Sequence, residues 1–143
     1  MTTVAQGRSP RVALTRAYHF SAAHRLSTPA LGPDDNARLY GPCHRPHGHN
    51  YYVEVTVTGT PDPQTGMAFD LGVLDAVVER TVVGEVDHRT LEEVPLLGGV
   101  ITTGEGLARA FFRALDAALP PGTLAGVVVQ ETAKNRFEYR SGA

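Results

Sequence analysis

The stretch His49–Gly59 has the sequence His-Asn-Tyr-Tyr-Val-Glu-Val-Thr-Val-Thr-Gly, in which apolar and polar side chains alternate from Tyr51 onward. Tyr51 and the valines at every second position after it share one side, and Tyr52, Glu54 and two threonines share the other. Because successive side chains of a strand point to opposite faces, this pattern predicts a strand with one buried and one polar face. Such a strand belongs in a sheet with a single covered face.

Other segments are also predicted to be strands. Val12–Phe20 is rich in β-branched and aromatic residues. The remaining predicted strands are 67–69, 127–131 and 137–140, the last two joined as a hairpin around Lys134-Asn135. Residues 27–42 hold three prolines and two glycines and are predicted to form a long loop.

Two helices are predicted between the strands. Asp70 is a favourable N-cap for a helix that ends near Gly84, with apolar residues at helical spacing. The second helix covers about 103–119, where Thr102 and Glu105 fit a capping box. The order strand, strand, helix, helix, strand, strand predicts an α+β fold, with an antiparallel sheet and the helices on one of its faces.

The bulk properties narrow the class of protein. A chain of 143 residues suits one domain, which we expect over 11–143 after a polar N-terminal tail at 1–10. The net charge of −2 argues against nucleic-acid binding, and no apolar stretch has the length of a membrane span. The tail lacks the apolar stretch of a signal peptide, and the single cysteine excludes an internal disulfide, so a cytoplasmic location is expected.

A metal site is predicted from three histidines. His47 and His49 flank Gly48 at the entry to the strongest strand, and residues two apart on a strand point to the same side. His24 follows the first strand and could lie beside them if the two strands pair. Three imidazoles with an open fourth position are typical of a catalytic zinc site, although imidazole also suits copper, iron and nickel.

Other polar residues have two interpretations each. Cys43 lies four residues before His47, so its thiol could act as a base or could be a fourth ligand that closes a structural site. The pair Asp87-His88 could orient a proton relay or simply form the polar end of the first helix. Glu131 comes at the end of a largely apolar run, where a carboxylate needs a hydrogen-bond donor. That donor could belong to a ligand or to a basic side chain.

Taken together, six segments resemble the 6-pyruvoyl/6-carboxytetrahydropterin synthase family. They occur in the family's order and cover nearly the whole chain after the tail. The segments are Phe20-Ser21-Ala22-Ala23-His24-Arg25-Leu26, Cys43-x-x-x-His47-Gly48-His49-Asn50-Tyr51, Gly66-Met67-x-x-Asp70, Asp87-His88, Thr103-x-Glu105 and Glu131-Thr132.

The resemblance implies a tunnelling fold (T-fold), a four-stranded antiparallel sheet with two helices on one face. In this family, sheets join into a barrel in a trimer, and two trimers stack into a hexamer. Active sites would then lie at subunit interfaces. The implied substrate is the pterin triphosphate 7,8-dihydroneopterin triphosphate.

The resemblance also implies roles for the candidate residues. His24, His47 and His49 would hold Zn²⁺, which polarises substrate hydroxyls as a Lewis acid. Cys43 would be the base that removes a substrate proton, with Asp87-His88 as its relay partners.

The pterin pocket follows from the same resemblance. Glu131 would bind the pterin's guanidine-like edge through paired hydrogen bonds, and Thr103 and Glu105 would help line the pocket. The resemblance does not identify the residues that bind the triphosphate. The basic candidates for that role are Arg25, Arg45 and Lys134.

Two branches of the family compete. The carboxy branch loses two side-chain carbons as acetaldehyde and feeds queuosine-type synthesis, whereas the pyruvoyl branch keeps all three carbons and feeds tetrahydrobiopterin. The short spacing from Cys43 to His47 resembles the carboxy branch, while Leu39-Tyr40-Gly41 and the ending 131–135 resemble the pyruvoyl branch. We favour the carboxy reaction because spacing around the base bears directly on catalysis. Thr102 stands where the family usually has proline.

Two further hypotheses assign the protein to other functional classes. In the first, Cys43 completes a closed site with the three histidines, and the protein is a non-catalytic zinc-stabilised binding module. In the second, the protein is a zinc hydrolase that uses metal-bound hydroxide and does not need Cys43.

Overall fold

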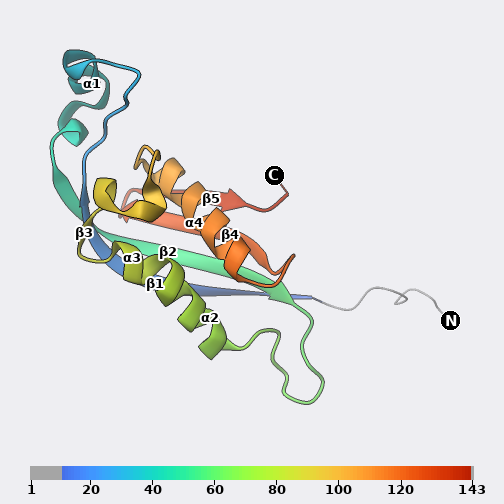
Figure 1. Ribbon diagram of the computed structural model, residues 1–143. Coiled ribbons are helices and arrows are strands. Elements are labelled where there is room, and N and C mark those ends of the chain that lie inside the picture. The colour runs from blue at the N-terminus through green and yellow to red at the C-terminus, as the bar shows by residue number, and fades with distance from the viewer. Residues whose placement is uncertain (1–10, 143) are drawn as a thin grey trace.

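The computed structural model describes residues 11–142 and contains one sheet with the strand order β3-β1-β2-β4-β5 (Figure 1). Its strands are β1 (Val12–His24), β2 (His47–Gly59), β3 (Arg89–Thr90), β4 (Leu124–Thr132) and β5 (Asn135–Arg140). The four long strands pair antiparallel, and β3 pairs in parallel with Ala22 and Ala23 of β1.

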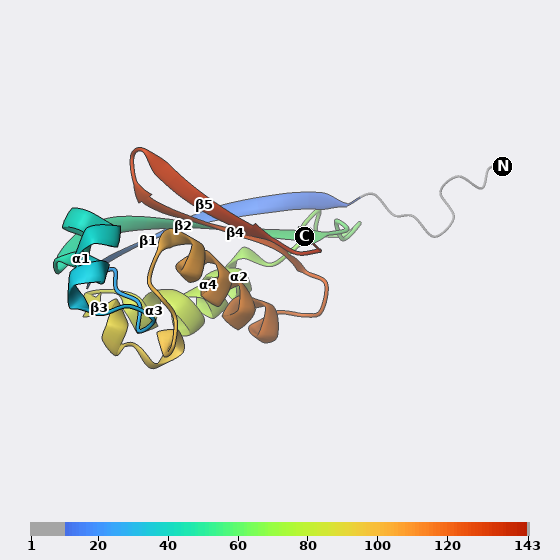
Figure 2. The same ribbon diagram turned by 90° about the horizontal axis from the view of Figure 1, so that it is seen from above.

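Helices α2 (Leu71–Val78), α3 (Gly84–Val86) and α4 (Gly104–Ala118) lie in a layer on one side of this sheet (Figure 2). Asp70 begins α2 by accepting hydrogen bonds from the backbone N–H groups of Gly72 and Val73. A π-helical turn at Glu79–Val83 joins α2 to α3. Two short 3-10 turns, Leu91–Glu93 and Pro95–Leu97, lead to α4.

The core lies between the apolar face of β2 and the helices. Tyr51 and the valines 53, 55 and 57 are at most 1% exposed, so the alternation in the sequence is matched by alternating burial. Phe20 of β1 stacks on Tyr51 with ring centroids 4.7 Å apart and meets the edge of Phe111 of α4 at 5.9 Å. Aromatic contacts of this kind add to the free energy gained by burying apolar surface.

The predicted α+β architecture, with a long-stranded antiparallel sheet and helices on one face, is confirmed. The sheet has five strands rather than four, because the two-residue β3 adds to the edge of β1. Within residues 11–142, no helix has the length and apolar character required to cross a membrane. The predicted tail at 1–10 lies outside the described residues.

The predicted strand at 67–69 is wrong, because those residues close a loop instead. The Asp62 carboxylate accepts hydrogen bonds from the N–H groups of Gln64 and Thr65, and the Asp62 N–H donates to the Met67 carbonyl. These local bonds satisfy backbone groups that a strand would pair with a neighbour.

The predicted loop at 27–42 contains helix α1 (Pro33–Tyr40), followed by a 3-10 helix at Gly41–His44. Proline in the first turn and two acidic residues beside it favour a helix start here. The buried Asn36 side chain accepts from the Thr28 N–H and donates to the Thr28 carbonyl, which holds the segment together.

Candidate active site

Three imidazoles meet where β1 ends and β2 begins. His24 is the last residue of β1 and is paired with His47, the first residue of β2. His49 lies two residues further along β2 on the same side, and one ligand nitrogen from each of the three lies within 4.8 Å of the others. The structure therefore brings together the three histidines whose convergence the spacing predicted.

Hydrogen bonds select the tautomers of two of these rings. His24 Nδ1 lies 3.0 Å from the Thr102 carbonyl oxygen, and His47 Nδ1 lies 2.6 Å from the Arg45 carbonyl oxygen. A carbonyl can only accept, so both Nδ1 atoms carry the proton and each Nε2 keeps a free lone pair. A histidine that binds a metal through one nitrogen commonly donates the other N–H in this way.

The environment favours the neutral form of His24 and His49, which is the form that binds metal. His24 is 2% exposed, and its burial, together with the nearby His47, lowers the pKa of His24 to about 4. Burial also lowers the pKa of His49. The tautomers, the short separations and the lowered pKa values fit a divalent cation of the zinc class.

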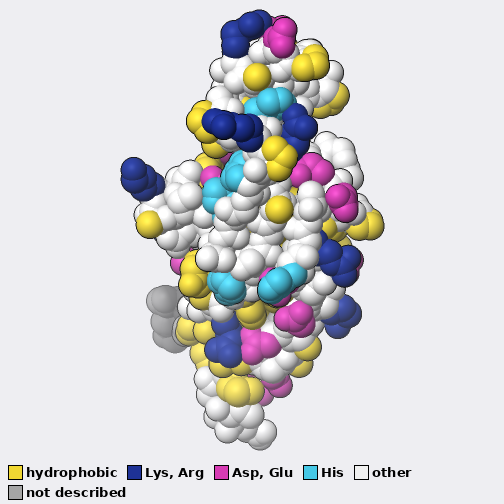
Figure 3. All heavy atoms as spheres, turned by 90° about the vertical axis from the view of Figure 1, so that its left-hand side faces the viewer, with side chains coloured by type: hydrophobic (Ala, Val, Ile, Leu, Met, Phe, Trp, Pro, Cys, Tyr) yellow, Lys and Arg dark blue, Asp and Glu magenta, His cyan; other side chains and the backbone are white. Residues whose placement is uncertain are grey.

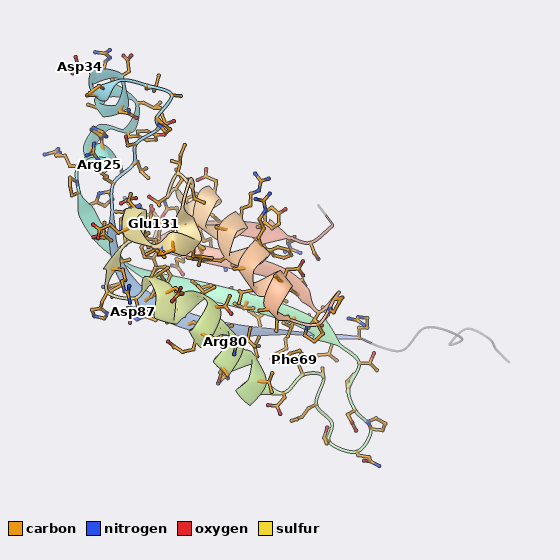
Figure 4. All side chains as sticks on the ribbon, in the orientation of Figure 1. Arg25, Asp34, Phe69, Arg80, Asp87 and Glu131 are labelled. Atoms are coloured by element: carbon orange, nitrogen blue, oxygen red, sulfur yellow. The ribbon has the colours of Figure 1, made fainter. Side chains whose placement is uncertain are left out.

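Two further side chains border the three imidazoles. The Tyr51 hydroxyl lies 3.3 Å from His24 Nε2, a contact that the sequence could have indicated because residues 47, 49 and 51 share one side of β2. A Glu131 carboxylate oxygen lies 3.8 Å from His24 Nε2 and 3.9 Å from His49 Nε2. Glu131 belongs to β4 and is labelled in Figure 4. A register shift in the β4–β5 pairing occurs at Glu131, as expected of a bulge that redirects a side chain beside a site.

The Glu131 side chain is 16% exposed, and its ion-pair partners within residues 11–142 are histidines alone. The basic side chain considered as its partner is therefore not found there. The carboxylate keeps acceptor capacity for a ligand with N–H groups.

Cys43 lies apart from the metal-ligand group. It is exposed, in the 3-10 helix at Gly41–His44, and in the described part of the chain the cluster of potential ligands contains the three histidines without this thiol. The backbone places this segment, because the Leu26 N–H donates to the Cys43 carbonyl at 2.8 Å. The arrangement does not support a closed site with four protein ligands.

Asp87 and His88 are held at the opposite edge of β1 from β2. An Asp87 carboxylate oxygen accepts the Ser21 N–H at 3.0 Å and lies 2.9 Å from His88 Nδ1, and the Ser21 bond is the main reason that the pKa of Asp87 is lowered. The backbone N–H of His88 donates to the Ser21 carbonyl at 2.6 Å. It has a positive φ of 60°, a strained conformation that is often found at functional sites.

Cys43 and the Asp87-His88 pair are attached to different parts of the chain. The backbone of His88 is hydrogen-bonded to Ser21 within β1, whereas the backbone of Cys43 is hydrogen-bonded to Leu26, beyond the end of β1 at His24. In the range 11–142, no side-chain hydrogen bond joins Cys43 to the Asp87-His88 pair.

At the start of α4, the capping prediction is wrong by one residue. Thr103 is the N-cap and accepts the Gly106 N–H at 3.1 Å, so the preceding Thr102 is not the cap. The Thr102 hydroxyl instead donates to Glu92 at 2.6 Å, and no sequence signal indicated a role for Glu92. Glu105 is exposed in the first turn of α4.

A surface hollow of about 470 Å³ lies beside β1, β2 and β3. Residues 21–23, 48–50 and 88–90 line it, so His49 and His88 border the same space. On the end of the molecule that carries α1 and β3, histidine side chains are exposed, and Lys and Arg side chains gather toward α1 (Figure 3).

Comparison with known proteins identifies the family of this chain. Residues 13–142 match the family described as 6-pyruvoyl tetrahydropterin synthase. The chain is 38% identical to human "6-pyruvoyl tetrahydrobiopterin synthase", with 98% of this chain and 99% of that protein covered. It is 33% identical to "6-carboxy-5,6,7,8-tetrahydropterin synthase" of a Synechocystis strain, with 87% and 89% covered.

A solved structure shows the same fold. The Caenorhabditis elegans 6-pyruvoyl tetrahydropterin synthase superposes with a TM-score of 0.89 at 35% identity and covers 94% of this chain and 99% of its own. These likenesses favour the pyruvoyl branch over the carboxy branch that the Cys43–His47 spacing predicted. The chain belongs to the 6-pyruvoyl tetrahydropterin synthase family.

Proposed function

We propose that this protein is a zinc-dependent lyase that converts 7,8-dihydroneopterin triphosphate to 6-pyruvoyl tetrahydropterin with release of triphosphate. The observation that carries the proposal is the convergence of His24, His47 and His49 within 4.8 Å, in a chain that matches the family over 13–142. Full-length similarity to the human protein named for this product supports the pyruvoyl reaction over the carboxy reaction.

His24, His47 and His49 would hold the Zn²⁺ ion. Bound there, zinc would supply Lewis acidity toward the hydroxyl groups of the substrate side chain. The hydrogen bonds at His24 Nδ1 and His47 Nδ1 keep both Nε2 lone pairs available and resist rotation of the rings.

Cys43 is the proposed base, and the Asp87-His88 pair is the proposed relay. The Asp87 carboxylate holds His88 by its Nδ1–H, which leaves Nε2 to accept or return a proton. Cys43 is attached beyond the end of β1 and His88 within it, so we propose that Cys43 of one copy works with Asp87-His88 of another. The open sheet edges allow such assembly into a trimer or hexamer.

Glu131 is the proposed anchor for the pterin ring. A carboxylate presents two parallel acceptors that match two adjacent N–H groups of a guanidine-like edge. Its position beside the imidazoles would set the substrate side chain near the three histidines. Thr103 and Glu105, at the start of α4, are proposed to complete the pocket.

The carboxy reaction stays as a second candidate because of one observation. Only three residues separate Cys43 from His47, a spacing that resembles the carboxy branch and fixes how far the base stands from the imidazoles. The two reactions differ in their carbon balance, since only the carboxy reaction releases acetaldehyde.

Incubation of the zinc-loaded protein with 7,8-dihydroneopterin triphosphate, followed by product identification, tests both candidates. Triphosphate release without acetaldehyde supports the pyruvoyl reaction. Acetaldehyde together with 6-carboxytetrahydropterin would assign the carboxy reaction instead. A protein that binds zinc but turns over no substrate would be a binding module, contrary to the proposal.

A further inference from the structure

The Thr102 hydroxyl occupies an unusual position between a candidate metal ligand and a carboxylate. His24 and Thr102 are each 2% exposed. His24 Nδ1 lies 3.0 Å from the Thr102 carbonyl oxygen and 3.1 Å from the Thr102 hydroxyl oxygen, and that hydroxyl lies 2.6 Å from Glu92 Oε2. Three groups from three segments of the chain are thus linked in series.

The direction of each bond follows from what the groups can donate. The Thr102 carbonyl has no proton, so the proton shared with it must sit on His24 Nδ1. The Thr102 hydroxyl donates its single proton to the Glu92 carboxylate, so toward His24 it presents a lone pair. Glu92 therefore orients the hydroxyl as an acceptor, and this reinforces the tautomer of His24 with a free Nε2.

Glu92 holds the same region by a second contact. Its Oε1 atom accepts the backbone N–H of Arg25, the residue that follows His24, at 3.3 Å. One carboxylate thus holds the end of β1 and the residue that orients the His24 ring. Glu92 lies on the short turn Leu91–Glu93, directly after β3.

We infer that Thr102 and Glu92 are positioning residues for the metal site, acting through His24. The hydroxyl and carboxylate set the tautomer and the orientation of the His24 ring and so raise the affinity for the divalent cation. This inference rests on the metal site in the proposed function. It assigns no contact between either residue and the substrate.

The test measures the dissociation constant for Zn²⁺ by competition with a chelating dye, on the full chain and without substrate. Thr102→Val keeps the shape and the backbone carbonyl but removes the hydroxyl, and we expect it to weaken zinc binding about tenfold or more. Thr102→Ser restores the hydroxyl and should bring affinity back to near the wild-type value. Glu92→Ala should also weaken binding, whereas Glu93→Ala, on the same turn, serves as the matched control.

A double variant distinguishes a linked chain from two separate structural effects. If Glu92 acts through Thr102, then Thr102→Val combined with Glu92→Ala should cost little more zinc affinity than Thr102→Val alone. Fully additive losses, or failure of Thr102→Ser to recover affinity, would overturn the inference. The absorption spectrum of the Co²⁺-loaded protein should change with Thr102→Val, because the ligand field reports the His24 orientation.

The controls separate this inference from the metal site itself. Wild-type zinc affinity in both Thr102→Val and Glu92→Ala would refute the positioning role alone. A wild-type chain that binds no zinc would refute the metal site and, with it, this role. If Thr102→Val fails to fold, the comparison of Glu92→Ala with Glu93→Ala decides, because both replace exposed side chains on the same turn.

Discussion

The imidazoles of His24 and His47 face each other across paired strands, with ring centroids 4.6 Å apart. Burial is the main reason that the pKa of His24 falls to about 4, and repulsion between the two rings when both are protonated lowers it further. A divalent cation bound between the two neutral rings would avoid this repulsion, because neither ring is then protonated. The first prediction follows from this pair and from His49 beside it.

Replacing His49 with alanine should abolish stoichiometric zinc binding, since two imidazoles form a much weaker site than three. Wild-type protein should bind about one zinc per chain. Free zinc at 100 times its dissociation constant should raise the free energy of unfolding by about 2.7 kcal/mol. Thermal unfolding with and without zinc, together with metal analysis, measures both effects.

His19→Ala is the matched control for His49→Ala. His19 lies on the exposed face of β1, where its ring packs 5.2 Å from Tyr52. Zinc content and zinc-dependent stabilisation should match the wild type. Equal zinc loss in both variants would show that the three-histidine cluster is not the binding site.

Replacing Cys43 with alanine should remove activity but leave the metal. Loss of a general base costs on the order of 10²–10⁴-fold in rate. Zinc content should stay near the wild-type value because Cys43 lies outside the three-histidine cluster. Measurement of kcat together with metal analysis distinguishes a base from a ligand. A fall in zinc content and folding stability together would instead identify Cys43 as a structural ligand.

Mixing two inactive variants should restore activity if sites are shared between copies. Cys43→Ala and His88→Ala each lack one proposed proton-transfer group. In a mixed oligomer, a Cys43 from one variant can meet a His88 from the other, and random mixing would restore about a quarter of the sites. Co-expression followed by activity assay measures this. Activity that stays at the level of the single variants would place both groups of one site in a single chain.

Gly104 and Phe137 form a tight contact that should couple in stability. A Cβ at Gly104 would lie 1.9 Å from Phe137 Cδ1, so Gly104→Ala should overpack the region and cost about 1–3 kcal/mol of unfolding free energy. Phe137→Val should reduce that cost in the double variant, because the smaller side chain makes room. Urea unfolding of the single and double variants measures the coupling.

Gly98→Ala is the matched control for Gly104→Ala. A Cβ there would meet no atom closer than the Pro95 carbonyl oxygen at 3.4 Å, which is ordinary contact. It should have little effect on stability. Additive losses for Gly104→Ala and Phe137→Val would show that the two side chains do not compete for the same space.

Asp75 should make stability depend on pH at the acidic end. Its carboxylate accepts hydrogen bonds from Arg16 at 2.7 and 2.9 Å and from the Tyr18 hydroxyl at 2.7 Å. The Arg16 hydrogen bond is the main reason that the pKa of Asp75 is lowered. A carboxyl whose pKa is lower in the folded state stabilises the fold above the pKa of the unfolded chain. That contribution is lost as pH falls through the folded value.

The variant Asp75→Asn should therefore unfold at a lower temperature than the wild type near pH 7, and the difference should shrink below pH 4. Thermal midpoints from pH 7 to pH 2.5 measure this. In an Arg16→Gln background the pH dependence of the Asp75→Asn effect should weaken, because the main partner is absent. A midpoint difference that stays constant over the whole range would show that Asp75 ionisation does not contribute.

Local patterns in the sequence were sufficient to predict much of the architecture. The alternation after Tyr51 predicted β2 and its buried face, Asp70 predicted the start of α2, and the apolar spacing over 103–119 predicted α4. The same period of two put His47 and His49 on one side of a strand. These features depend on neighbours within a few residues, which a sequence states directly.

Tertiary structure decided what distant segments do to each other. The pairing of β1 with β2 set His24 opposite His47, and only the fold could show that Thr102 orients His24 and meets Glu92 instead of capping α4. The tertiary structure likewise shows that the backbone of Cys43 bonds to Leu26, beyond β1, and that of His88 to Ser21, within β1. Contacts of this kind arise from strand register and packing between segments far apart in the chain, and local propensity does not encode them.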